Sequence, residues 1–116
     1  MATVYKTLGQ LAGVTDINTP QTLYQVASGK SALISNIVVC NQSASDQTFR
    51  ISCSSTTTPE AKEFIAYGVT VPANDSIPLV MGVTLYNSGA GSNVQYLLCS
   101  ATSASVSFSA FGVEMT

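Results

Sequence analysis

Few residues in this chain have side chains that could act in catalysis. Its 116 residues include no histidine, so Ser-His-Asp and Cys-His arrangements are absent. Six carboxylates could in principle form an acid–base pair: Asp16, Asp46, Glu60, Glu63, Asp75 and Glu114. All but Glu114 stand in or near turn segments, where solvated or capping carboxylates are common. We therefore predict that the chain is not an enzyme and has no catalytic residues.

Glu114 differs from the other carboxylates because the residues around it, 111–115, are otherwise apolar. We expect its side chain to point to solvent. The alternative is an ion pair with a Lys or Arg of another subunit.

Residues that bind metals or phosphate are equally sparse. Cys40, Cys53 and Cys99 are an odd number of cysteines without a close pair, which argues against a disulfide framework and a zinc knuckle. The acidic residues lack the spacing of a calcium loop, although a calcium site shared between subunits stays open. The glycines of residues 87–92 precede a strand-like run instead of a helix, unlike a phosphate-binding loop. The sequence thus predicts no cofactor and no metal site, and we interpret the cysteines as small core residues.

The charge content restricts the partners of the chain. Only 9% of the residues are charged, against about 25% in typical proteins, and the net charge is −2. Four scattered cations cannot neutralise a run of phosphates, which argues against nucleic acid. No stretch approaches the roughly 18 apolar residues of a membrane span, and no secretion signal is recognisable, so we expect no membrane. The surface is therefore mostly neutral, as expected of a protein whose faces become covered.

Alternation of apolar and polar residues predicts strands through most of the chain. In residues 47–53 the pattern places Phe49, Ile51 and Cys53 in the core and Thr48, Arg50 and Ser52 in solvent. Residues 21–27 and 77–85 show similar alternation, with odd-numbered residues of 77–85 inward. In residues 106–115 Phe108 and Phe111 point to opposite faces unless a bulge near Gly112 intervenes.

Two further runs, residues 31–41 and 93–101, are apolar on both faces, as in central strands or strands whose outer face meets another subunit. Turn-forming residues separate the runs at short intervals: 28–30, 41–46, 58–60, 72–75 and 87–92. Residues 59–64 form either a helical turn or a longer loop. Seven or eight strands spaced in this way predict an all-β antiparallel sandwich, either jelly-roll or immunoglobulin-like.

We expect residues 1–116 to form a single β-sandwich domain. Residues 1–20 are less regular and form either its first strand or an N-terminal arm that pairs with a neighbouring subunit. Val4, Tyr5, Leu8 and Leu11 would then be candidates for a subunit interface.

Several segments together resemble a family: residues 28–32, 37–41, 49–51, 64–67, 72–76 and 108–112. They resemble small virion structural proteins of tailed bacteriophages, including those that infect cyanobacteria. The similarity starts near Leu8 and rests on strand and turn patterns instead of chemical signatures. It implies a β-sandwich module on the virion, made in the host bacterial cytoplasm. Such a module would be a capsid cement or decoration protein, or alternatively a tail, neck or baseplate fibre module that binds host surface polysaccharide.

What is known of decoration proteins implies a homotrimer that binds the major capsid protein or other virion proteins. The outward residues of the two doubly apolar runs would then contribute to interfaces, and Ile34, Val38, Leu97 and Cys99 are the candidates. Ordinary packing in the core of the chain is the alternative for each of them. A hydrolase of the cell envelope is disfavoured by the missing histidine.

Overall fold

A computed structural model describes residues 3–14, 16–87 and 95–115. This part of the chain contains eight strands and one 3-10 helix: β1 (Thr3–Leu11), β2 (Gln21–Gln25), β3 (Ser31–Asn41), β4 (Gln47–Ser54), η1 (Ala61–Glu63), β5 (Phe64–Val71), β6 (Ser76–Tyr86), β7 (Tyr96–Ala101) and β8 (Val106–Met115). Residues 59–64 therefore include a helical turn, one of the two alternatives. The predicted turn at 87–92 lies largely outside the described residues.

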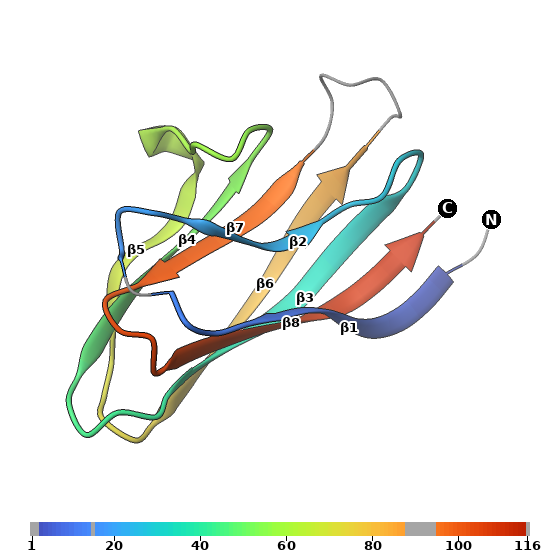
Figure 1. The fold of residues 1–116 in the computed structure, drawn as a ribbon. Coiled ribbons are helices and arrows are strands. Elements are labelled where there is room, and N and C mark those ends of the chain that lie inside the picture. The colour runs from blue at the N-terminus through green and yellow to red at the C-terminus, as the bar shows by residue number, and fades with distance from the viewer. Residues whose placement is uncertain (1–2, 15, 88–94, 116) are drawn as a thin grey trace.

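The strands form two antiparallel sheets that face each other (Figure 1). Sheet A has the order β1-β8-β3-β6 and sheet B the order β2-β7-β4-β5. The chain therefore pairs β1 with β8, β2 with β7, β3 with β6 and β4 with β5, like one long hairpin rolled around a core. This winding defines a jelly roll. The predicted antiparallel sandwich is confirmed, and its layout is the jelly roll.

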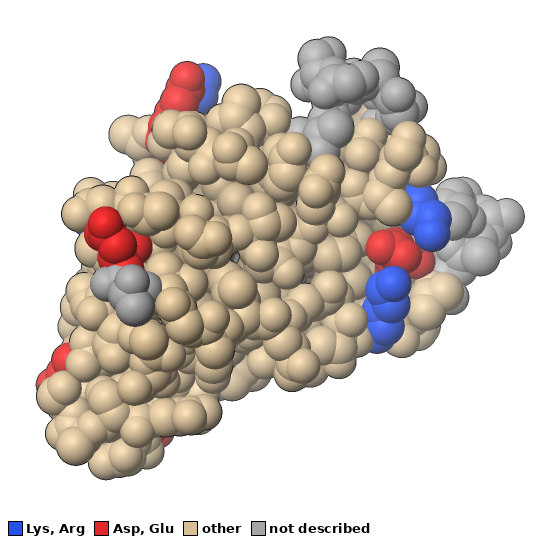
Figure 2. Space-filling model, viewed as in Figure 1, with Lys and Arg blue, Asp and Glu red and all other residues tan. Residues whose placement is uncertain are grey.

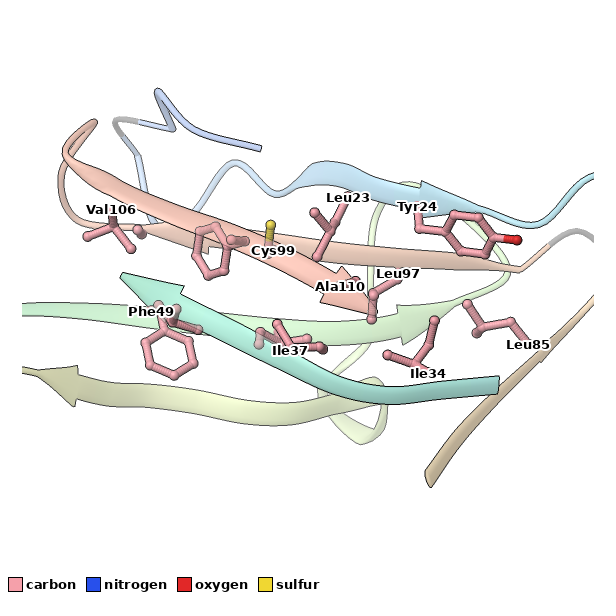
Figure 3. Packing of buried hydrophobic residues seen from close by; sticks show 14 of the residues in the cluster. Leu23, Tyr24, Ile34, Ile37, Phe49, Leu85, Leu97, Cys99, Val106 and Ala110 are labelled. Carbon is pink, nitrogen blue, oxygen red and sulfur yellow. The ribbon is translucent and has the colours of Figure 1, made fainter. Parts of the chain in front are cut away.

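The core lies between the inner faces of the two sheets (Figure 3). Phe49 of sheet B and Phe108 of sheet A are fully buried, and their ring centroids are 6.0 Å apart in an edge-to-face arrangement. Ile34 and Ile37 of β3 and Ile51 of β4 are also fully buried in the same cluster. Full burial of each such side chain stabilises the fold by about 1.5–3 kcal/mol.

An irregularity at Ser35 decides which residues of β3 face the core. The pairing with β8 passes from Ile34↔Gly112 to Asn36↔Phe111, so Ser35 is an extra residue in β3. Because of this bulge, Ile34 and Ile37 both point inward although they are three residues apart. Phe108 and Phe111 lie on opposite faces, as regular alternation predicts.

Gly112 faces the inner side of β8 at the same place, where the two strands approach closely. A Cβ on Gly112 would lie 2.0 Å from the carbonyl oxygen of Leu33. No other residue fits there without a shift of the backbone, because real Cβ atoms never approach an oxygen so closely.

Glu114 marks one end of the sandwich, where it pairs with lysines of its own chain. Its Oε1 lies 3.1 Å from Lys6 Nζ and 3.6 Å from Lys30 Nζ, and Tyr24 donates a 2.7 Å hydrogen bond to Oε2. The hydrogen bond from Tyr24 and the two ammonium groups lower the pKa of Glu114, whereas burial and the carboxylate raise the pKa of Tyr24. Only 13% of the Glu114 side chain is exposed, so the prediction that it points to solvent is wrong. The cluster instead ties β1, β2 and β8 together.

Candidate interaction surface

The carboxylates in turns act as caps. Asp16 accepts hydrogen bonds from Asn18 N at 2.9 Å and from Thr19 Oγ1 at 3.1 Å. Glu63 Oε1 accepts from Glu60 N at 2.8 Å in a capping box, and these bonds lower the pKa of Glu63. The capping role proposed for such residues is confirmed for these two.

Two of the three free cysteines are small apolar residues in or beside the core. Cys40, in contrast, is half-buried outside the core cluster on the outer side of sheet A, so its interpretation as a core residue is wrong. Cys99 is buried and Cys53 is packed against the core. Burial raises the pKa of the Cys53 thiol to about 11 and raises that of Cys99 as well, so both thiols stay protonated at neutral pH. Among the described residues, no three His, Cys, Asp or Glu side chains lie close enough to hold a metal ion.

The outer face of sheet A is an uncharged, largely apolar surface. The strand register aligns twelve of its outward residues in three central rows across β1, β8, β3 and β6. These rows are Tyr5–Val113–Leu33–Thr84, Thr7–Phe111–Asn36–Val80 and Gln10–Ser109–Val38–Pro78, and we call them the neutral face. Tyr5 is 82% exposed and Val80 is 85% exposed, which is unusual for side chains of this size.

None of the ten charged residues of the chain belongs to the neutral face. Lys6, Lys30 and Glu114 gather at one end of the sandwich, where Lys6 borders the face. The other charges lie in turns, in η1 or on sheet B. In the view of Figure 2 the charged side chains likewise form small groups near the ends, and most of the surface is uncharged.

A shallow groove crosses the neutral face between β1 and β3. Tyr5 and Thr7 line one side, Leu33 and Ser35 the other, and Phe111 and Val113 form part of its floor. A partner side chain of moderate size could insert there. Beside the groove, Asn36 Oδ1 is buried and has no hydrogen-bond partner among the described residues.

Part of the outer face of sheet B, over β7 and β4, is in contrast covered by its own chain, whereas Tyr67 of β5 stays 63% exposed. The segment between β1 and β2 crosses the covered part, and the Ile17 carbonyl accepts a 2.8 Å hydrogen bond from Ser100 Oγ. Arg50 Nη1 donates to Asn18 Oδ1 of the same segment at 3.1 Å. As a result, Leu98 and Ser100 are almost fully buried although they point away from the core cluster.

Ser52 is also buried on this outer face, at 1% exposure, so the prediction that it faces solvent is wrong. Ser52 lies between Leu98 of β7 and Phe64 of β5 in the register, and these larger side chains flank it. Strand alternation correctly placed Ser52 on the other face of β4 from Phe49 and Ile51. It did not show that side chains of neighbouring strands would bury Ser52 on that outer face.

The seven candidate interface residues fall into three groups. Tyr5 and Val38 belong to the neutral face, and Val4 is 50% exposed on β1 beside it. Leu8 and Leu11 are partly buried against the core. Ile34 and Leu97 are fully buried inside the chain, as is Cys99, so core packing, the alternative considered for them, describes their position.

Residues 3–11 form strand β1, which pairs with β8 of the same chain along its whole length. Its other edge is an edge of sheet A. The segment thus lies in the chain's own sheet.

Sequence reasoning missed Val80, Phe111, Leu33 and Val113 as surface residues. A signal for Val80 was present, because the inward position of Leu79 in an alternating strand turns its neighbours outward. The outward position of Leu33 depends on the bulge at Ser35, which no local pattern marks.

No known family model matches the chain, and no curated protein matches it. Among solved structures, it is similar to a chain of infectious bursal disease virus, Gx strain, at 12% identity and a TM-score of 0.55. That match covers 97% of this chain and 32% of the viral chain. A chain of the T13 viral particle of the same virus matches at 10% identity and a TM-score of 0.53, with 97% and 29% covered.

A pentameric capsid protein isolated from metagenomic phage sequences is a weaker match, at 16% identity and a TM-score of 0.43, covering 97% of this chain and 64% of that protein. The chain therefore spans about a third of the length of the first two chains that it resembles. At these identities the two matches to chains of infectious bursal disease virus establish a shared fold. None of the helices in the described residues could cross a membrane.

Proposed function

We propose that this chain is a structural protein of a virion, in which the neutral face is covered by a second copy of the chain. The observation that carries the proposal is the contrast between the two outer faces. The β7 and β4 part of sheet B is covered by its own chain, whereas the largely apolar outer face of sheet A is left open. A large uncovered apolar surface is typical of a protein–protein interface.

The chemistry of the neutral face favours a copy of the same chain as its occupant. Charged side chains of a partner would lose water against this face without gaining an ion pair, so an uncharged partner surface fits best. With four strands about 4.8 Å apart and three rows about 6.6 Å apart, the face measures roughly 380 Å², about half of the 800 Å² per partner of a standard interface. The net charge of only −2 also keeps repulsion between copies low.

We propose further that the copies form a homotrimer that acts as a capsid cement protein of a tailed phage. A cement protein stabilises by mass action, because it binds the assembled shell and not its separated subunits. The likeness of the fold to chains of viral particles supports a place in a shell. In this proposal residues 1–116 act as one module that is made in the host cytoplasm and binds the major capsid protein.

The test compares particles of the encoding phage with and without this protein. We expect particles that lack it to lose their DNA at lower temperature, and purified protein added back to restore the wild-type temperature. Quantitative mass spectrometry of wild-type particles should give copies in a fixed ratio to the major capsid protein. A handful of copies per particle and unchanged heat resistance would contradict the cement role and favour a tail or baseplate position instead.

A further inference from the structure

A second surface feature lies on the opposite sheet, at the start of β5. Phe64 and Tyr67, together with Ala61 of η1, line an open hollow of about 480 Å³. The two rings are 5.0 Å apart and nearly perpendicular. Hollows of this size with aromatic walls are typical of small-ligand sites.

The ring of Tyr67 is held in place although most of the residue is exposed. The guanidinium of Arg50 lies 4.2 Å from the ring centroid and covers one face of the ring. Arg50 is itself fixed by Asn18 Oδ1 and by the packing of β4 between β5 and β7. Since Tyr67 is still 63% exposed, the rest of its ring surface is open to a ligand. A rigid, exposed aromatic ring loses little conformational entropy when it binds.

The charges around the hollow indicate what kind of ligand fits. Arg50 has no carboxylate partner among the described residues. Nearby, Lys62 pairs with Glu60 at 3.5 Å, and Glu63 caps η1, so two cations and two carboxylates balance. Neither a strongly acidic nor a strongly basic ligand is favoured by this surface.

Hydroxyl groups are abundant in the segment that leads into η1. Residues 55–58, which lead into η1, are one serine and three threonines, and all are exposed. Hydroxyls and a fixed arginine donor suit a ligand that itself carries many hydroxyls, and an aromatic ring suits one with an apolar face. A sugar ring combines both properties in one unit.

We propose that this hollow binds a neutral sugar residue of a polysaccharide, with the sugar stacked on Tyr67 and Phe64. The site lies on sheet B and is therefore separate from the neutral face. It stays open when a second copy covers sheet A. The proposal does not depend on whether the chain is a cement protein.

The experiment screens the purified protein on a glycan array of neutral and acidic bacterial surface polysaccharides, then measures Kd for the strongest neutral glycan by calorimetry. We expect binding to at least one neutral glycan. Tyr67→Ala should weaken it tenfold or more, and Tyr67→Phe, which keeps the ring, should bind within threefold of wild type. Tyr86→Ala, which removes a 54% exposed tyrosine of β6 outside both the hollow and the neutral face, is the matched control and should bind like wild type.

Three results would overturn the proposal: no binding to any neutral glycan, binding to acidic glycans alone, or equal affinity of the Tyr67→Ala variant. Binding of an acidic peptide in place of sugars would also overturn it. Circular dichroism checks that each variant is folded. Because Tyr67 lies away from the neutral face, Tyr67→Ala should leave the oligomeric state unchanged, so failure here is distinguishable from failure of the proposed assembly.

Discussion

The two outer faces of the sandwich are both built from antiparallel strands, but they differ in how far their outward side chains are buried. On sheet B, Leu98 and Ser100 are buried because the segment between β1 and β2 crosses them and bonds to β4 and β7. On sheet A, Tyr5 and Val80 remain more than four-fifths exposed. The chain thus covers part of one outer face and leaves the other open. The comparison teaches that an apolar outer face can be buried within this chain, and the uncovered face of sheet A is for that reason the one to which we assign a partner.

The largest expected effect comes from truncating one leucine on each face. Leu98→Ala should lower the free energy of unfolding by about 3 kcal/mol, because it leaves a cavity under the covering segment. Leu33→Ala on the neutral face should cost less than about 1 kcal/mol in the monomer, since its surroundings are half open. Urea unfolding at low protein concentration measures both. Equal losses would show that the faces do not differ as described.

The next effect concerns the cluster at the end of the sandwich. Glu114→Gln removes the carboxylate that joins Lys6, Lys30 and Tyr24, and should lower the free energy of unfolding by about 2 kcal/mol, as expected for hydrogen bonds to a charged group.

The same cluster predicts that stability depends on pH. Since folding lowers the pKa of Glu114 below its ordinary value of 4.5, its stabilisation is complete above that value and is lost as the pH falls through the lowered pKa.

The neutral face should not share this dependence, because it carries no carboxylate, lysine or arginine. We expect self-association to be constant between pH 5 and pH 8, while the difference in unfolding free energy between wild type and Glu114→Gln shrinks in acid. Sedimentation and urea unfolding over a pH series follow the two quantities. An association that changed with pH in this range would indicate that charged groups at the border, such as Lys6, take part.

A smaller effect is expected from two serines. Ser100→Ala loses the hydrogen bond to the Ile17 carbonyl and leaves that acceptor under the cover, which should cost about 1 kcal/mol. Ser109→Ala removes only a weak 3.4 Å contact from Gln10 on the open face and should change stability by less than about 0.5 kcal/mol. Thermal unfolding of both variants measures these losses. Equal losses would contradict the conclusion that the segment between β1 and β2 is packed against sheet B.

The smallest effect should be a gain. Asn36→Leu removes the buried, unpaired Oδ1 from the neutral face and adds apolar surface, so it should stabilise the monomer by about 0.5 kcal/mol and tighten self-association. A loss of stability would mean that Asn36 is satisfied in solution.

Local patterns predicted much of this fold. The alternation in residues 47–53 correctly placed Phe49 and Ile51 in the core, because alternation depends only on the pleat of one strand. The jelly-roll order could not be chosen over the immunoglobulin-like layout, because it depends on which distant strands pair. The buried position of Ser52 depends on its neighbours Leu98 and Phe64 on the adjacent strands, and the inward position of both Ile34 and Ile37 depends on the bulge at Ser35.

The candidate surface was predicted only in part. The low charge content correctly indicated an uncharged surface, because ten charged residues are too few to cover every face of the chain. Tyr5 and Val38 were named, whereas Ile34 and Leu97 were not separable from the core, because a strand that is apolar on both faces does not reveal which face is inside. Glu114 was misplaced because its partners, Lys6 and Lys30, are far away in the sequence.

The central claim is that a second copy covers the neutral face, and sedimentation equilibrium tests it most directly. Val80→Asp places a charge at the β6 end of the central row of the face, while Ile65→Asp, at an exposed isoleucine of β5, places the same charge on sheet B. We predict that the wild type and Ile65→Asp form trimers at micromolar concentration and that Val80→Asp is monomeric. A monomeric wild type at the highest concentration, or a Val80→Asp variant that assembles like the wild type, would contradict the account.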